Sequence, residues 1–417
     1  MGMFFEEHAK LLSDFARVSQ STGARADYVQ GGGGNTSVKL PGGLMAIKAS
    51  GFCLSDIRPD KAYAVLDGAD LRNFYLTTDP SALADVEKEG SARAKADVRH
   101  IDGLADLRPS VEAGFHSILK TFVVHTHSVY ANLAACSTAC RPIAAQAFAG
   151  ANYTWGWVPY TDPGANLTFA IRDELRRVEK ETGKVPSVIL MQNHGIIVHD
   201  DDPDTALAIH TDANERLARM FGLTGTSFPK IAVREMAAGI YAADVPYLAD
   251  QFQTGGYSQE FLMTQPLYPD QMVFLTDTFF LNKEVLEDGQ AVASSKTGEM
   301  LMQMDAKKAL TLTETLTAVF FVMEHMIALN RSMRFSSMSL SPTFSLLMPG
   351  IICMSSPMPP IFLSDSNCTR KSSSVKVASL TRFSMRFISS ASMASCARST
   401  SVTISPMPSI LPAMRSG

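Results

Sequence analysis

The stretch Thr121-Phe122-Val123-Val124-His125-Thr126-His127 carries two histidines, one residue apart, at the end of a short apolar run. Short runs rich in Val and Phe are typical of buried β-strands. Side chains alternate between the two faces of a strand, so His125 and His127 should share one face and Thr126 should lie on the other. The stretch therefore predicts a strand that presents two imidazoles to one point in space.

A third histidine follows a second apolar run, in the stretch Ser187-Val188-Ile189-Leu190-Met191-Gln192-Asn193-His194-Gly195. A glutamate lies upstream, in Arg108-Pro109-Ser110-Val111-Glu112. Three imidazoles and one carboxylate are the donor set of a zinc site with catalytic capability. The alternative is three ordinary histidines at strand ends, but a His-x-His pair with a third histidine favours the metal. We predict one Zn²⁺ per subunit, held by His125, His127, His194 and Glu112.

The segment before the His-x-His strand should form a helix. Ser110 is predicted to cap a helix that runs to Leu119, which puts Glu112 in the first turn and His116 one turn later. A first-turn glutamate often only complements the helix dipole. A carboxylate beside a metal can also bind it at rest and then act as acid or base. We predict that second role for Glu112, and a structural role for His116.

The glycine-rich stretch Gly33-Gly34-Asn35-Thr36-Ser37 predicts an anion cradle, because its backbone N–H groups are not screened by side chains. The turn Ala49-Ser50-Gly51 adds an N–H group and a hydroxyl, and Ser110 adds another hydroxyl. A flexible linker would explain the glycines equally well. A nucleotide site is not expected, because neither a Walker pattern nor a spaced Gly-x-Gly-x-x-Gly after a strand is present.

The composition bounds the class of protein. The chain has 417 residues, a formal charge of −4, 46% hydrophobic residues and six scattered cysteines. The mild acidity gives no indication of nucleic-acid binding. No apolar run approaches the roughly 20 residues that cross a bilayer, and the first residues do not form a signal peptide. We expect a soluble cytoplasmic protein with a small-molecule substrate and no nucleic-acid or membrane partner.

The order of elements favours an α+β or three-layer α/β/α domain. A hairpin is predicted from strands at 36–40 and 44–48, joined by a Pro-Gly-Gly turn. A strand is predicted at 272–276, after Tyr268-Pro269-Asp270. Helices are predicted at 5–20, 128–140, 165–182, 204–221 and 306–329, with a mostly helical, exposed segment at 79–105.

Residues 331–417 differ in composition from the rest of the chain. They hold 24 serines and nine methionines but only one acidic residue, Asp365, and their Lys and Arg show no periodicity. Composition alone suggests a disordered or low-complexity basic tail, but natural disordered tails are usually rich in Glu, Lys or Gln rather than in Met, Ile, Leu and Phe. We hypothesise a translation in the wrong reading frame, which intact-mass analysis of natively produced protein would test. The alternative is a basic tail that binds a membrane or a partner.

Five motifs together resemble the class II aldolase/adducin family. In chain order they are Gly33-Gly34-Asn35-Thr36-Ser37-Val38-Lys39, Ile47-Lys48-Ala49-Ser50-Gly51, Arg108-Pro109-Ser110-Val111-Glu112, Val124-His125-Thr126-His127 and Gln192-Asn193-His194-Gly195. The chain is most similar to the aldolase part of bifunctional rhamnulose-1-phosphate aldolase/alcohol dehydrogenases. The resemblance covers about residues 5–225 and continues more weakly to about 330.

This resemblance implies a three-layer α/β/α fold with a mixed β-sheet (1–225), followed by a smaller C-terminal α/β extension (226–330). It implies that the three histidines hold zinc and that Glu112 is the metal-proximal acid/base. It implies a homotetramer with the site between subunits. The positions that match the family's substrate contacts are Gly34, Asn35, Ser50, Gly51 and Ser110.

The implied reaction is retro-aldol cleavage of a ketose 1-phosphate, or a similar hydroxy-keto acid, through a metal-stabilised enediolate. Val111 stands where sugar-phosphate aldolases of the family often carry a second serine, which removes one phosphate donor. An epimerase, dehydratase or decarboxylase would use the same metal and carboxylate. An adducin-like scaffold would be expected to lack the ligands that are present here.

Overall fold

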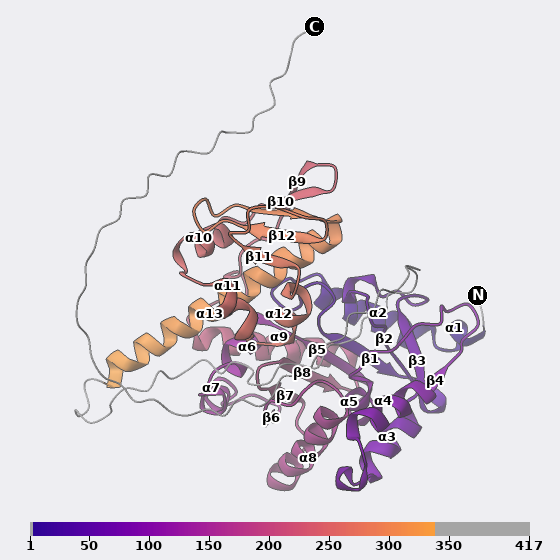
Figure 1. The fold of residues 1–417 in the computed structure, drawn as a ribbon. Coiled ribbons are helices and arrows are strands. Elements are labelled where there is room, and N and C mark those ends of the chain that lie inside the picture. Colours follow the sequence, from indigo (N-terminus) through magenta and orange to yellow (C-terminus); the bar gives the residue numbers. More distant parts are fainter. Residues whose placement is uncertain (1–2, 338–417) are drawn as a thin grey trace, which may run out of the picture. The chain divides into compact units, whose positions relative to one another are not determined.

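A computed structural model describes residues 3–337 of the chain, with side chains up to residue 326 (Figure 1). Its first part is built on an eight-stranded sheet with the order β4-β3-β2-β1-β5-β8-β7-β6. Only β6 and β7 pair in parallel, so the sheet is mixed. The strands are β1 (Asn35–Lys39), β2 (Leu44–Lys48), β3 (Tyr63–Asp67), β4 (Val98–Arg99), β5 (Phe122–Thr126), β6 (Trp155–Val158), β7 (Val188–Met191) and β8 (Gly195–Asp200).

The predicted hairpin is confirmed, because β1 and β2 pair antiparallel with Val38 opposite Ala46. Gly42 and Gly43 make the turn at φ of 75° and 80°, which glycine adopts without a steric penalty. Strand β1 also pairs with β5, and Asn35 lies opposite His125. The glycine loop before β1 is thereby placed beside the His-x-His strand.

Helices cover both faces of this sheet, which confirms the three-layer fold. One face packs against α3 (Gly68–Thr77), α5 (Ala113–Ile118) and α8 (Ala165–Thr182), with α4 (Val86–Ala96) on α8. The other face packs against α2 (Ala9–Gly23), α6 (Val129–Ala135), α7 (Cys140–Ala147) and α9 (Pro203–Met220). The short helix α1 (Met3–Glu7) precedes α2.

Local signals explain which helix predictions succeed. The helix predicted at 165–182 is confirmed, and Gly183 ends it at φ 73°, the usual glycine cap. The helix predicted at 204–221 is confirmed within one residue, because Asp202 caps it and Pro203 opens it. The single helix predicted at 128–140 is wrong, since α6 and α7 are separate there. The segment 79–105 is only partly helical, with α4 followed by β4.

The C-terminal region forms a second sheet with the order β11-β12-β13-β10-β9. Its strands are β9 (Val233–Ala237), β10 (Ile240–Ala243), β11 (Phe279–Leu281), β12 (Gln290–Ala293) and β13 (Met300–Gln303). Its helices are α10 (Pro246–Thr254), α11 (Gln259–Thr264), α12 (Pro269–Leu275) and α13 (Ala306–Ser337). One hydrophobic core joins this region to α6, since Val129, Tyr130 and Leu133 are buried in the same cluster as Phe279 and Phe320.

The strand predicted at 272–276 is wrong, because these residues belong to helix α12 apart from Thr276. Pro269 opens α12, and its fixed φ suits the first turn of a helix. Leu275 is fully buried in the shared core, whereas Val273 is exposed. Only one side of the segment is buried, as in a helix that packs on a core. The sequence does not show this periodicity, because Met272-Val273-Phe274-Leu275 are four consecutive apolar residues.

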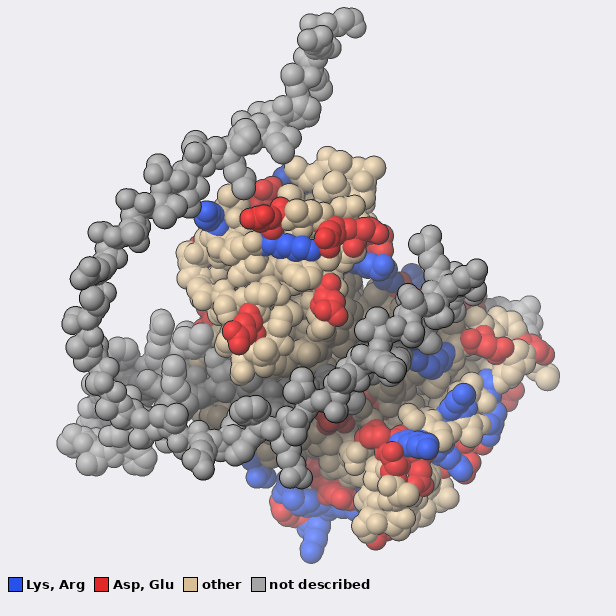
Figure 2. Space-filling model, in the orientation of Figure 1, with Lys and Arg blue, Asp and Glu red and all other residues tan. Residues whose placement is uncertain are grey.

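Helix α13 begins at the predicted residue, Ala306, and continues to Ser337, past the predicted boundary at residue 330. The hypothesis about residues 331–417 lies largely outside the described residues. Within the described part, no helix has the combination of length and apolar character needed to cross a membrane. On the face shown in Figure 2, acidic and basic side chains are interspersed over the described residues.

Candidate metal centre

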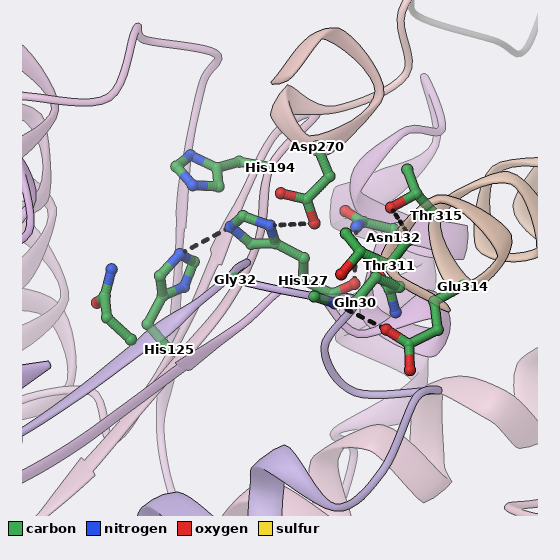
Figure 3. A network of polar contacts seen from close by, with 12 residues as sticks. Gln30, Gly32, His125, His127, Asn132, His194, Asp270, Thr311, Glu314 and Thr315 are labelled. Atoms are coloured by element: carbon green, nitrogen blue, oxygen red, sulfur yellow. Dashed lines mark hydrogen bonds and ion pairs between the residues drawn. The ribbon is translucent and has the colours of Figure 1, made fainter. Parts of the chain in front are cut away.

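Three histidines converge at one end of the large sheet (Figure 3). His125 is in β5 and His127 follows that strand directly, so both imidazoles lie on the face that strand alternation predicts. Their Nε2 atoms are 3.1 Å apart. One ligand atom from each of His125, His127 and His194 lies within 4.8 Å of the other two, and all three residues are buried. Such a group can hold a metal ion.

His194 reaches this point because of the turn between β7 and β8. Strand β8 pairs with β5, with Thr126 opposite Ile196, so the turn lies beside His127. Asn193 adopts φ 52°, a left-handed conformation that Asn tolerates better than most residues. The sharp turn lets His194 approach the pair on β5 instead of continuing along β7.

Glu112 lies against this triad. Its Oε1 atom is 3.2 Å from His194 Nε2, and its Oε2 atom is 3.5 Å from His125 Nε2. The predicted helix start needs correction, because α5 begins at Ala113 and Glu112 is the residue before it. Ser110 is therefore not the cap, although its Oγ accepts a hydrogen bond from the Glu112 N–H at 3.3 Å. Outside the helix, the Glu112 side chain turns toward the imidazoles.

The electrostatics favour an ionised Glu112 carboxylate next to a neutral His125 imidazole. Burial raises the pKa of Glu112, but the imidazoles of His125 and His194 outweigh burial and hold that pKa well below its usual range. Burial lowers the pKa of His125 to about 3. Metal binding requires a deprotonated carboxylate and an imidazole free to donate a lone pair. Glu112 and His125 meet that requirement at neutral pH.

Asn35 and His116 form a second layer behind Glu112. Asn35 Nδ2 donates to Glu112 Oε2 at 2.6 Å and to Ser110 Oγ at 3.1 Å. His116 Nε2 contacts Asn35 Oδ1, and His116 Nδ1 is 2.7 Å from Ser37 Oγ. The amide of Asn35 is thus fixed with its NH₂ toward Glu112. His116 lies outside the histidine triad, in the structural position that the sequence predicts.

The three segments that the sequence predicts to form an anion cradle lie close together. An isolated bridge between Ala49 and Pro109 brings the Ser50–Gly51 turn beside Ser110. Arg108 Nη2 donates to Ser50 Oγ at 3.1 Å, which adds a guanidinium to which the sequence reading assigned no role. Gly34 has φ 63°, and a Cβ there would lie 2.6 Å from the His125 carbonyl oxygen. Only glycine fits this approach of the loop to β5.

Lys48, which belongs to the motif Ile47-Lys48-Ala49-Ser50-Gly51, is a further cation near the site. Its Nζ donates to the carbonyl oxygens of Gly32 and Phe52, both at 2.8 Å. Burial lowers the pKa of this ammonium to about 8. The lysine joins the glycine loop to the turn after β2, which are two segments of the predicted cradle.

Asp270 is the residue that sequence reasoning missed. Its Oδ2 atom is 2.8 Å from His127 Nδ1, although the two residues are 143 positions apart. Burial lowers the pKa of His127, but the Asp270 carboxylate outweighs burial and raises it overall. The only local signal was an aspartate after a proline, which is also typical of an ordinary helix start.

The described residues thus form a three-layer domain that carries a histidine triad and one adjacent carboxylate. Residues 13–221 match the family model described as the class II aldolase and adducin N-terminal domain. The chain belongs to this family. The finer resemblance to the bifunctional rhamnulose-1-phosphate aldolases stays a prediction, and a comparison with curated proteins finds no match.

Several solved structures are similar to part of the chain. The N-terminal class II aldolase domain of a conserved protein from Thermoplasma acidophilum is 20% identical, covers 49% of this chain and 91% of its own, and gives a TM-score of 0.41. YgbL from Escherichia coli, a putative aldolase/epimerase/decarboxylase, is 20% identical. The match covers 55% of this chain and 95% of YgbL, with a TM-score of 0.34. L-fuculose-1-phosphate aldolase from Thermus thermophilus is 16% identical. The match covers 50% of this chain and 93% of the aldolase, with a TM-score of 0.30.

Proposed function

We propose that this protein is a zinc-dependent aldehyde-lyase that cleaves a ketose 1-phosphate, or a similar hydroxy-keto acid, by retro-aldol chemistry. The observation that carries the proposal is the convergence of His125, His127 and His194 around Glu112 in a buried site. Membership of the class II aldolase and adducin family supports the same reading.

The residues present fit zinc better than a hard cation. Three imidazole nitrogens and one carboxylate match the ligands that zinc takes in catalytic sites, whereas Mg²⁺ and Ca²⁺ prefer oxygen donors. We propose His125, His127 and His194 as ligands, with Glu112 as a fourth that leaves when substrate arrives. When bound, zinc supplies the Lewis acid that polarises the substrate's carbonyl and neighbouring hydroxyl.

Glu112 is the proposed acid/base. Its carboxylate is ionised and can accept a proton, and Asn35 holds its Oε2 at 2.6 Å. In the cleavage direction the substrate hydroxyl would lose its proton as the C–C bond breaks, and the electron pair of that bond would pass to the enediolate. Glu112 would take up that proton and then deliver it to the enediolate carbon. The reverse transfer would remove a proton from the same carbon.

The proposed substrate contacts lie on the loops around this carboxylate. Gly34 and Gly51 supply open backbone, and Asn35, Ser50 and Ser110 supply polar side chains. Arg108 adds charge beside Ser50. Val111 is 59% exposed and offers no hydrogen-bond donor from its side chain. A carboxylate-bearing substrate is therefore kept as an alternative to a phosphate.

The test measures zinc content by elemental analysis and deuterium uptake from D₂O into dihydroxyacetone phosphate by NMR. We expect near-stoichiometric zinc and measurable exchange, both lost in His125→Ala. His100→Ala is the matched control, because His100 is exposed and pairs with Asp106 away from the triad. Zinc without exchange would favour an epimerase, dehydratase or decarboxylase. Full zinc retention by His125→Ala would refute the ligand assignment, and no zinc in wild-type protein would favour an adducin-like scaffold.

We also propose a cytoplasmic homotetramer, on the family resemblance alone. Light scattering coupled to size exclusion should give a mass near four times 45.2 kDa. A mass of 45.2 kDa would contradict the tetramer.

A further inference from the structure

The second nitrogen of each histidine determines how firmly a metal ligand is oriented. A ligand imidazole commonly donates its other N–H to a carboxylate or a carbonyl, which fixes the tautomer and the ring plane. His125 Nδ1 lies 3.0 Å from the Ile196 carbonyl oxygen in the neighbouring strand. His127 Nδ1 lies 2.8 Å from Asp270 Oδ2, and Asp270 belongs to α12 in the C-terminal region (Figure 3).

We propose that Asp270 is a positioning residue for the metal site. Its carboxylate accepts the Nδ1–H of His127 and leaves the Nε2 lone pair facing His125 and the shared metal position. The inference rests on the proposed metal site and deepens it. It makes the C-terminal region part of that site, although Asp270 lies outside the family match at residues 13–221.

A role as a simple first-turn residue that complements the dipole of helix α12 does not account for the surroundings of Asp270. A first-turn aspartate that only complements a helix dipole is normally hydrated. Asp270 is 3% exposed, and among the described residues its only ion pair is with His127. A buried carboxylate is costly unless it is paired, so the contact with His127 is what makes the placement of Asp270 tolerable.

The segment before α12 holds a second part of the site. Asn193 Nδ2 donates to the Leu267 carbonyl oxygen at 2.8 Å, and Asn193 is the neighbour of His194. Residues 267–270 therefore contact both the His127 strand end and the His194 turn. One short piece of the C-terminal region thus contacts one proposed ligand, His127, and the chain neighbour of another, His194.

The glycine loop packs against the same region, which limits how far Asp270 can move. A Cβ on Gly33 would lie 2.6 Å from Asp270 Oδ2, so the loop passes directly over the carboxylate. Two residues earlier, the Gly31 N–H donates to Glu314 Oε2 of α13 at 2.9 Å. Asp270 is thus enclosed between the loop and His127.

The first experiment measures zinc affinity of the full chain by competition with a chromogenic chelator, in wild type, Asp270→Asn and Asp270→Ala. Loss of an outer carboxylate partner typically costs about 10–100-fold in metal affinity. We expect a loss in that range for Asp270→Ala and a smaller one for Asp270→Asn, whose amide oxygen can still accept the hydrogen bond. Glu324→Gln is the matched control, since it removes a carboxylate charge from the same region, where Glu324 accepts a hydrogen bond from Tyr247. Its affinity should stay within about twofold of wild type.

The second experiment observes His127 itself, by ¹⁵N-histidine NMR of the zinc-loaded protein. In wild type, His127 should carry its proton on Nδ1, and this proton should exchange slowly with water. In Asp270→Asn, a variant that keeps the shape of the side chain, exchange should be faster. Unchanged exchange in Asp270→Asn would overturn the proposal even if Asp270→Ala loses affinity through misfolding.

The outcomes separate the two proposals. If wild type binds zinc and Asp270→Ala binds it within twofold of wild type, the positioning role is wrong and the metal site stands. If wild type binds no zinc, both proposals fall. If Glu324→Gln loses as much affinity as Asp270→Ala, the effect is a general one of the C-terminal region, and the specific role of Asp270 is refuted.

Discussion

Gly34 shows how a residue without a side chain can determine the position of a ligand. It adopts φ 63° and lets the loop before β1 approach the backbone of His125. Its neighbour Asn35 faces His125 across the strand pair and donates to Glu112. The geometry of the site therefore depends on backbone conformation as well as on the ligands.

Replacing Gly34 by alanine should destabilise the protein and weaken zinc binding. The left-handed conformation alone should cost roughly 1–2 kcal/mol with a side chain, and the overlap with the His125 carbonyl adds to it. Gly42→Ala is the control, because Gly42 has φ 75° with nothing within 4 Å of the added Cβ. Urea unfolding should show a loss in both variants, but zinc affinity should fall only in Gly34→Ala. Equal zinc affinities would contradict the role given to Gly34.

Replacing Glu112 by glutamine should separate metal binding from proton transfer. The three histidines remain, so zinc should stay bound, while deuterium uptake into dihydroxyacetone phosphate should fall by about 10²–10⁴-fold. Elemental analysis and NMR on one preparation measure both quantities. An exchange rate close to that of wild type would rule out Glu112 as the acid/base.

The triad and Glu112 could be predicted from the sequence because each lies next to an element with a clear local pattern. Asp270 could not, because its partner is 143 residues away and its own segment reads as an ordinary helix start. Arg108 and Lys48 were visible in the motifs, but their partners depend on how separate loops fold together. Local periodicity predicts which side chains share a face, and it says little about which distant segments meet.

At the scale of elements, the hairpin and the long amphipathic helices were predictable, whereas the helix α12 and the exact start of α5 were not. The strand prediction at 272–276 failed because four consecutive apolar residues suit a buried strand and a packed helix equally. The helix that Ser110 was predicted to cap starts two residues later than expected, because Glu112 turns toward the triad instead of joining the helix. Tertiary contacts decided both cases.

Helix α9 carries a buried histidine, His210, that contacts the strand of the triad and makes the stability of the protein depend on pH. His210 Nε2 lies 2.8 Å from Thr126 Oγ1 in β5, and the His210 ring packs edge-on against Tyr28. Burial, together with a smaller effect of the Arg25 guanidinium, lowers the pKa of His210 to about 3. His210 is therefore neutral in the folded protein at every pH above about 3.

The metal-free protein should lose stability as the pH falls below the unfolded histidine pKa. An unfolded histidine takes up a proton near pH 6.5 and the folded His210 does not, so its contribution is present above pH 6.5 and is lost toward pH 3. Between pH 7.5 and pH 5, His210→Gln should lose roughly 2 kcal/mol less than wild type in urea unfolding. The control His100→Gln is at an exposed position and should not reduce the loss. An equal loss in wild type and His210→Gln would contradict this account.

At the scale of the whole molecule, the part that matches the family model shares a hydrophobic core with the C-terminal region. The buried residues Val129, Tyr130 and Leu133 on α6 pack in one cluster with residues of the C-terminal region. Asp270 and Glu314 reach back from that region to His127 and to the glycine loop. The predicted boundary at 225/226 is thus crossed by both apolar and polar contacts.

A fragment of residues 1–225 should therefore fail to fold as a stable unit. Exposing the three α6 side chains should cost about 1.5–3 kcal/mol each, which is comparable with the ~5–15 kcal/mol stability of a typical domain. We expect strong dye binding to exposed apolar surface and no stoichiometric zinc. A chain ending at Ser337 retains every contact named above and should bind zinc like the full chain. A monodisperse, zinc-loaded 1–225 fragment would contradict this prediction, because it would show that these residues fold without the C-terminal region.

The shared core also has a consequence for how the chain is made. Helix α6 ends at Ala135, but its covering residues extend to Met326, which the ribosome adds about 190 residues later. At synthesis rates of about 5–20 residues per second, the apolar face of α6 stays exposed for roughly 10–40 s before the residues that bury it are synthesised. Nascent chains stalled after residue 225 should recruit chaperones that bind hydrophobic segments, and chains stalled well past Met326 should release them.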